Sequence, residues 1–153
     1  MVQLYEAGNS KLRPNAVAFN AVLNACAFTP DGHDLESGKA LEIAHKTLKE
    51  MEQSPFAKPD QVTYGTFLKV CANQMPESDT RQQLVEILFK KCVRDGQVGN
   101  LVLKELKAVA SPELYSKLVL GRHIDDDVRI EDLPKEWREN VVEGRWRRQQ
   151  NHR

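Results

Sequence analysis

The sequence predicts an all-α protein, a helix-turn-helix repeat solenoid in which antiparallel helix pairs form a right-handed superhelix. The segment 17–27 aligns with the segment 62–72, and a second amphipathic run follows each copy. Each copy also comes directly after a proline and an Asn or Asp. Self-similarity at a period of a few tens of residues is typical of stacked helix pairs. The aligned identities are Val17 with Val62, Leu23 with Leu68, Cys26 with Cys71 and Ala27 with Ala72.

The spacing of apolar residues predicts the individual helices. Ser111 can cap a later helix, with Pro112 at its first position and Gly121 at its end. A last helix is expected to begin near Leu133 and to continue into the C-terminal tail. Proline, Gly and Asp mark the loops between these elements. The other expected helices lie at about 16–28, 35–53, 61–74 and 78–94, with a shorter one that begins at 101.

The repeats divide the chain into five parts. The last unit is expected to be degenerate, because a terminal repeat covers the open end of the core. Its sequence departs from the pattern, since Lys104 aligns with the aromatic residues Phe19 and Tyr64. The parts are 1–15, the tail of a preceding repeat; 16–60, repeat one; 61–100, repeat two; 101–122, the degenerate terminal repeat; and 123–153, an acidic linker, a terminal helix and a basic tail.

Composition bounds the class of protein. The chain has 153 residues, of which 41% are hydrophobic and 29% charged, and its net charge is zero. These values are ordinary for one soluble domain and argue against a generally basic nucleic-acid binder. No apolar run approaches the roughly 20 residues that span a bilayer, so no membrane association is expected. Neither a secretory signal nor a transit peptide is visible at the N-terminus.

The predicted core follows the apolar stripes of the helices. Cys26 and Cys71 occupy the same helical position in two copies, so we expect both to be small buried residues rather than disulfide partners. The expected core residues are Phe19, Leu23, Cys26, Ala44, Leu48, Met51, Leu68, Cys71, Leu84, Leu88 and Phe89.

No constellation of residues predicts an enzyme, a cofactor, a metal site or a small-molecule substrate. The four histidines, at 33, 45, 123 and 152, lie on separate elements without metal-ligand spacing. Consecutive carboxylates at 125–127 are more typical of a solvated loop than of a metal site. Trp137 and Trp146 either pack over the core or stack on bases. The arginines of 145–153 are expected to add non-specific affinity for phosphates, or else to form only a solvated tail.

The paired segments, each after a Pro-Asn or Pro-Asp ending, resemble the pentatricopeptide repeat family over about residues 1–110, which suggests a C-terminal fragment of a repeat array. The strongest match is the run from Lys58 to Leu68, which is similar to the family's repeat boundary. The resemblance implies sequence-specific binding of single-stranded RNA, one base per repeat. It also implies an organellar transcript as partner, in mitochondria or plastids, and a role in RNA processing, stability or translation. Helical repeats suit this task, because two or three side chains of a unit can face the edge of one unstacked base.

The resemblance also implies which residues bind RNA. In the family, the residue after the aromatic of the first helix acts with the last residue of the repeat. These are Asn20 with Asp60 in repeat one, a pair that resembles the uracil-preferring combination, and Gly65 with Asn100 in repeat two. The candidate set also contains Asn15, and the wedge between neighbouring bases falls on Val17 and Val62.

Three alternatives stay open from the sequence. Asp60 and Asn15 follow a proline and precede a helix, so each is also a candidate N-cap, and Val17 and Val62 are also candidate core residues. At the level of function, the alternative is a protein–protein adaptor of the tetratricopeptide-like helical-repeat type. That type's Trp-Leu-Gly-Tyr signature is not found in either unit. A surface of Asn, Lys and Arg favours RNA, whereas exposed apolar anchors favour a peptide.

Overall fold

The computed structural model describes residues 16–28, 34–126 and 128–141. Within these ranges the regular structure consists of six α-helices and two short 3₁₀ turns, with no strand. The predicted all-α class is confirmed for this part of the chain. None of the described helices is both long and apolar enough to cross a membrane.

The observed helices lie close to the predicted ones. The helix expected at 61–74 has the same ends, and most other ends differ by one residue, because the caps lie outside the helices that they begin. Ser78, for example, is the N-cap that accepts a hydrogen bond from the backbone of Arg81, and the helix starts at the next residue. The elements are α2 (Ala16–Ala27), α3 (Asp34–Gln53), α4 (Gln61–Gln74), α5 (Asp79–Arg94), α6 (Asn100–Val109), α7 (Pro112–Leu118), η2 (Ile130–Asp132) and η3 (Lys135–Trp137).

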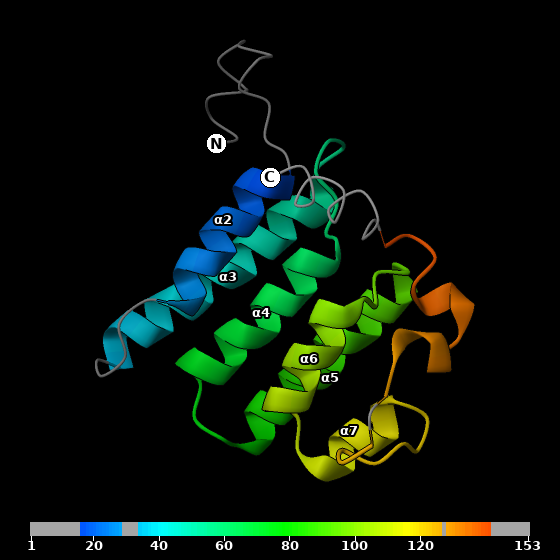
Figure 1. Ribbon diagram of the computed structural model, residues 1–153. Coiled ribbons are helices and arrows are strands. Elements are labelled where there is room, and N and C mark those ends of the chain that lie inside the picture. The colour runs from blue at the N-terminus through cyan, green and yellow to red at the C-terminus, as the bar shows by residue number, and fades with distance from the viewer. Residues whose placement is uncertain (1–15, 29–33, 127, 142–153) are drawn as a thin grey trace, which may run out of the picture.

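The helices form two layers (Figure 1). In one layer α4 lies between α2 and α6 and packs against both. The second helices of the units form the other layer, in which α3 contacts α2 and α4, and α5 contacts α4 and α6. Helix α7 and the turn η3 pack against α5. The helices α2, α4 and α6 all begin at the upper end of the view in Figure 1, so that their N-termini form one edge of the molecule.

The core lies between the two layers and agrees with the predicted list except at one position. Leu84 is only partly buried, whereas the other ten residues predicted for the core are buried. Most of the buried residues form one cluster that continues into the C-terminal part through Tyr115, Ile130 and Leu133. A smaller cluster of Phe19, Met51 and Ala57 lies apart from it. The hydrophobic pattern of the sequence therefore predicts the buried faces of α2, α3, α4 and α5 correctly.

The C-terminal part differs from the prediction. Helix α7 ends at Leu118, followed by Leu120 and Gly121 with φ values of 60° and 83°. The last helix expected from Leu133 onward is wrong for the described residues, where the regular structure is only the short turn η3, which follows η2. Trp137 packs against the core, with its ring edge-on to Phe89 at 5.8 Å between centroids. This packing favours the structural alternative for Trp137.

Alkaline pH is expected to destabilise the fold, because burial raises the pKa of several core groups. Burial raises the pKa of the Cys71 thiol to about 12, and it also raises the pKa values of Cys92 and Tyr64. In the unfolded chain thiols lose their protons near pH 8.5. Between about pH 9 and 12 the unfolded state therefore binds fewer protons, and the free energy of unfolding falls as pH rises.

Urea denaturation at pH values between about 7 and 11 measures this effect, with an expected loss of up to about 1.4 kcal/mol per pH unit for each fully shifted group. The variant Cys71→Ala lacks one of these groups, so its stability should fall less steeply with pH. A free energy of unfolding that stays constant up to pH 11 would contradict the burial of these groups.

Candidate nucleic-acid interface

Helices α2 and α4 present matching rows of side chains on the exposed side of their layer. Positions spaced four, three and four residues apart share one face of an α-helix. In both rows these positions are exposed or partly exposed, and they begin with the valine that the family resemblance marks as a wedge. The rows are Val17, Ala21, Asn24 and Phe28 on α2, and Val62, Thr66, Lys69 and Asn73 on α4.

The two wedge candidates lie on the surface. The side chains of Val17 and Val62 are 77% and 38% exposed, respectively. The alternative that they are core residues is therefore wrong. An exposed valine at the same position of two neighbouring helices leaves apolar surface that a flat base could cover.

Asn20 and Asp60 are in direct contact, although 40 positions separate them in the sequence. The Nδ2 atom of Asn20 donates a hydrogen bond to Oδ1 of Asp60 at 3.2 Å. Asp60 also caps α4, because the same Oδ1 accepts the backbone N–H of Thr63 at 3.0 Å. The capping alternative for Asp60 is thus confirmed, and the cap also holds Asn20. Asn20 is more buried than a groove-facing residue would be, with 9% of its surface exposed.

Thr63 completes this arrangement, and the sequence analysis did not single it out. Its hydroxyl oxygen accepts the backbone N–H of Asp60 at 3.0 Å, which makes the two residues a reciprocal capping box. The same hydroxyl lies 2.7 Å from Oδ1 of Asn20. The spacing of Asp60 and Thr63, three positions apart just before an apolar run, is the signal that could have found it.

Gly65, the second-unit counterpart of Asn20, is a packing residue. A Cβ atom at this position would lie 2.7 Å from Cγ of Leu101, closer than carbon atoms approach. The absence of a side chain thus allows α4 and α6 to pack closely at their N-terminal ends. Repeat two accordingly presents no side chain at the position that Asn20 occupies in repeat one.

The start of α6 changes the register of the third unit by one residue. The N-cap of α4 is Asp60, whereas the N-cap of α6 is Gly99 and Asn100 is the first helical residue. Tyr64 lies four residues after the N-cap Asp60, and the residue four positions after the N-cap Gly99 is Leu103, which is buried. The alignment of Lys104 with the aromatics is therefore wrong, and the third unit does carry an apolar residue at that position. Asn100 is exposed at the start of α6, and its counterpart in α4 is Gln61.

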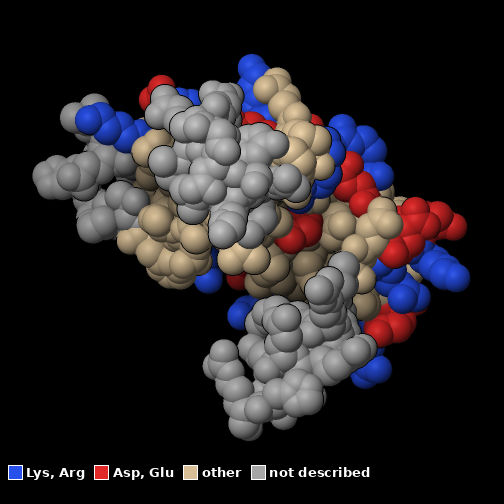
Figure 2. Space-filling model, turned by 90° about the horizontal axis from the view of Figure 1, so that it is seen from above, with Lys and Arg blue, Asp and Glu red and all other residues tan. Residues whose placement is uncertain are grey.

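Charge is distributed unequally between the two layers. The charged residues of α2, α4 and α6 are three lysines and one glutamate, and the glutamate, Glu105, is only 8% exposed. Lys104 and Lys107 are exposed on α6, and Lys69 is partly exposed on α4. The layer of α2, α4 and α6, called the first layer below, therefore offers basic side chains, and its helices carry no exposed carboxylate. Figure 2 views the molecule from the edge where these helices begin, and the coloured part of that face shows acidic and basic side chains among uncharged surface.

Phe28 and Lys69 form an aromatic–cation pair at the far end of the two rows. Phe28 is 60% exposed, and the Nζ atom of Lys69 lies 4.9 Å from the centre of its ring. Next to it, the side-chain amide of Asn73 donates to the backbone carbonyl of Ala27 at 2.8 Å, which ties the end of α2 to α4. Aromatic and cationic groups of this kind are those on which unpaired bases and phosphates are bound.

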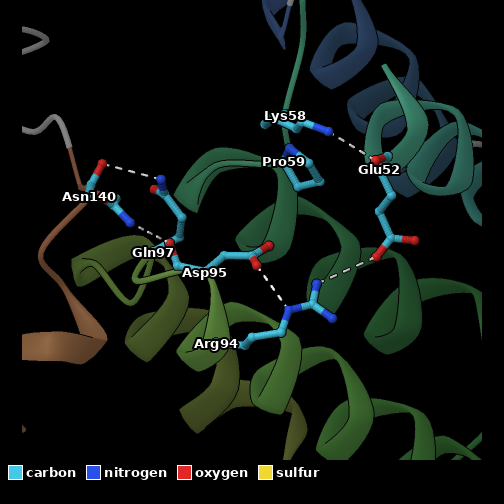
Figure 3. A pocket seen from close by; sticks show the side chains of 7 residues that line it. All are labelled: Glu52, Lys58, Pro59, Arg94, Asp95, Gln97 and Asn140. Carbon is cyan, nitrogen blue, oxygen red and sulfur yellow. Dashed lines mark hydrogen bonds and ion pairs between the residues drawn. The ribbon is translucent and has the colours of Figure 1, made fainter. Parts of the chain in front are cut away.

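A hollow of about 460 Å³ lies beside the edge where α4 begins (Figure 3). Arg94 forms ion pairs with Asp95 at 3.0 Å and Glu52 at 3.9 Å, and Lys58 donates to the backbone carbonyl of Glu52 at 3.1 Å. With two cations and two carboxylates in its lining, the hollow has no strong excess charge, and we assign no ligand to it. Its lining consists of Glu52, Lys58, Pro59, Arg94, Asp95, Gln97 and Asn140.

The remaining candidate positions lie in an exposed loop or outside the described residues. Asp125 and Asp126 are exposed in the loop after α7, as expected for a solvated segment. Within the described ranges, no group of three or more His, Cys, Asp or Glu residues is placed to hold a metal ion. Outside the described residues lie Asn15, His33, His152, Trp146 and the arginine tail.

Comparison of the chain with known proteins adds no further assignment. Models of protein families, curated proteins and solved structures gave no match. The resemblance to pentatricopeptide repeats therefore remains an expectation from the sequence, and the argument for function depends on the geometry of the first layer.

Proposed function

We propose that this chain binds single-stranded RNA across the exposed side of α2, α4 and α6, with each helix pair acting as one repeat of a solenoid. Asn20 and Asp60 together contact the edge of one base, and Val17 and Val62 contact the faces of neighbouring bases. An organellar transcript is the partner that the family resemblance favours. The proposal includes no catalytic step.

The contact between Asn20 and Asp60 is the observation that carries the proposal. The family resemblance pairs these two residues only by their positions in the repeat. Nδ2 of Asn20 lies 3.2 Å from Oδ1 of Asp60. An amide and a carboxylate together offer a donor and an acceptor, which is what the edge of a base requires. The exposed valines at the first position of each row are the second support, since they leave apolar surface on the two neighbouring helices.

The charge of the first layer suits the rest of the ligand. The phosphates of a single strand bound across α2, α4 and α6 would be attracted by Lys69, Lys104 and Lys107, which lie along α4 and α6. Attraction between phosphates and lysines supplies most of the sequence-independent affinity of RNA-binding proteins. Within α2, α4 and α6 the one carboxylate, Glu105, is buried, so the helices of this layer present lysines without an exposed acidic side chain.

The adaptor alternative also has one observation in its favour. The rows on α2 and α4 contain Val17, Phe28 and Val62, which are exposed apolar anchors of the kind that bind a peptide. We favour RNA because lysines and amide side chains lie among these anchors. Binding of an apolar peptide with no measurable binding of RNA would reverse this choice.

Reversal of the charge at three lysines of this layer tests the proposal. The variant Lys69→Glu, Lys104→Glu, Lys107→Glu is expected to weaken binding of a mixed-sequence single-stranded RNA by at least about tenfold at low salt. Each lost phosphate contact should also reduce the slope of log affinity against log salt by roughly 0.7. Fluorescence anisotropy titrations at two salt concentrations measure both quantities.

The matched control carries the same change of charge on the other layer. Lys39, Lys46 and Lys49 are exposed on α3, and their replacement by Glu should change the affinity by less than about threefold, through long-range charge alone. Equal weakening by both triple variants would mean that RNA senses only net charge. An absence of RNA binding by the unmodified chain at low salt would refute the proposed function itself.

A further inference from the structure

Thr63 touches both members of the candidate base-contacting pair, but it cannot touch a ligand itself. Its side chain is fully buried. We propose that Thr63 is a positioning residue that fixes the orientation of the Asn20 side-chain amide, and that this orientation sets the preference for uracil over cytosine. The inference rests on the proposed function and adds a residue that determines its specificity.

The hydrogen bonds around Thr63 form a closed ring, and each bond of the ring has one donor and one acceptor. The backbone N–H of Asp60 donates to the Thr63 hydroxyl at 3.0 Å, and that hydroxyl donates to Oδ1 of Asn20 at 2.7 Å. Nδ2 of Asn20 then donates to Oδ1 of Asp60 at 3.2 Å. The hydroxyl also lies 3.0 Å from Oδ1 of Asp60, but it has a single proton, and its contact with Asn20 is the shorter one.

The opposite orientation of the amide is unfavourable in this ring. If the Asn20 amide were rotated by half a turn, its carbonyl oxygen would face the carboxylate of Asp60. Two acceptors would then meet without a proton between them, and the carboxylate would lose its bond from Asn20. Side-chain amide orientation is decided by such networks. Here the carboxylate of Asp60, which can only accept, selects the side on which the NH₂ group lies, and the Thr63 hydroxyl holds the amide oxygen at 2.7 Å.

A fixed amide can distinguish bases that a rotating amide cannot. The pairing edge of uracil has a donor, N3–H, flanked by carbonyl acceptors, whereas cytosine has an acceptor at N3 and an amino donor beside it. An amide that rotates freely offers its donor or its acceptor to either base. An amide held by Thr63 keeps its oxygen on the side of Thr63 and its NH₂ group on the side of Asp60. It therefore fits only one order of donors and acceptors.

Replacement of Thr63 by Val tests this role in the full chain. Valine has nearly the same shape as threonine but lacks the hydroxyl, so it removes the bond to Asn20 with little change in packing. The conservative variant Thr63→Ser keeps the hydroxyl. Affinity is measured for short adenine-rich RNAs in which one central base is uracil or cytosine, and the reported quantity is the ratio of the two dissociation constants.

We expect Thr63→Val to lower this ratio, because only Asp60 then holds the amide, with a smaller change in affinity for the cytosine RNA. Thr63→Ser is expected to keep the ratio of the unmodified chain. If Thr63→Val keeps the full preference for uracil, the positioning role is overturned while the proposed function stands. If the unmodified chain binds RNA but does not distinguish the two bases, the positioning role also falls. If the unmodified chain binds no RNA, the proposed function itself is refuted.

A second measurement does not depend on the folding of Thr63→Val. In the unmodified chain, the side-chain NH₂ protons of Asn20 are expected to be protected from exchange with solvent, and the variant Asn20→Ala identifies their NMR signals. The signals of the exposed Asn24 serve as the reference for rapid exchange. Equal exchange at Asn20 and Asn24 would show that the amide is not held and would overturn the inference.

Discussion

Replacement of Leu68 by Ala is expected to lower the free energy of unfolding by about 2–5 kcal/mol. Leu68 is fully buried in the main core cluster, on the α4 helix that packs against both α2 and α6. Truncation there removes apolar contacts and leaves a cavity that the surrounding helices close only in part. For a chain of this length the thermal midpoint should fall by between about 4 and 20 °C, which differential scanning calorimetry measures.

The matched control is Ile87→Ala. Ile87 is 52% exposed on α5, and its truncation should change the stability by no more than about 0.5 kcal/mol. If Leu68→Ala and Ile87→Ala had the same small effect, the assignment of the buried face of α4 would be wrong. Both variants keep the charge of the chain, so the comparison reports burial alone.

The replacement Asn20→Thr is expected to move the base preference of repeat one from uracil to guanine. The family resemblance implies this change, because Thr combined with Asp resembles the guanine-preferring pair. The structure adds a cost in stability, since the threonine is too short to keep the bonds to both Asp60 and Thr63. We expect that cost to be about 1–2 kcal/mol, partly offset because the Thr63 hydroxyl can turn to Oδ1 of Asp60 at 3.0 Å.

Competition among the four bases at one position of a short RNA measures this preference. Asn24→Thr is the control, because it makes the same chemical change one turn further along α2, on an exposed position away from Asp60. Only Asn20→Thr should alter the order of the four bases. Equal affinities for all four bases, before and after the substitution, would leave Asn20 as part of a helix cap and remove the case for base contact.

The sequence by itself determined the helices and their buried faces. Helix ends follow from local signals such as Pro59-Asp60 before α4 and Ser111-Pro112 before α7, and these signals act over a few residues. The apolar stripe that contains Leu23 and Cys26 in α2, and its copy in α4, predicted which sides pack together. The family resemblance also paired Asn20 with Asp60, although nothing local connects them.

Only the tertiary structure decided how these positions are used. Thr63 holds the Asn20 amide from a different helix, and Gly65 is small because Leu101 of α6 lies against it. Because the N-cap of α6 is Gly99, Leu103 takes the buried position that the alignment gave to Lys104. Such contacts join residues about 36–43 positions apart. Periodicity within one helix contains no information on them, because they depend on how closely two neighbouring helices approach.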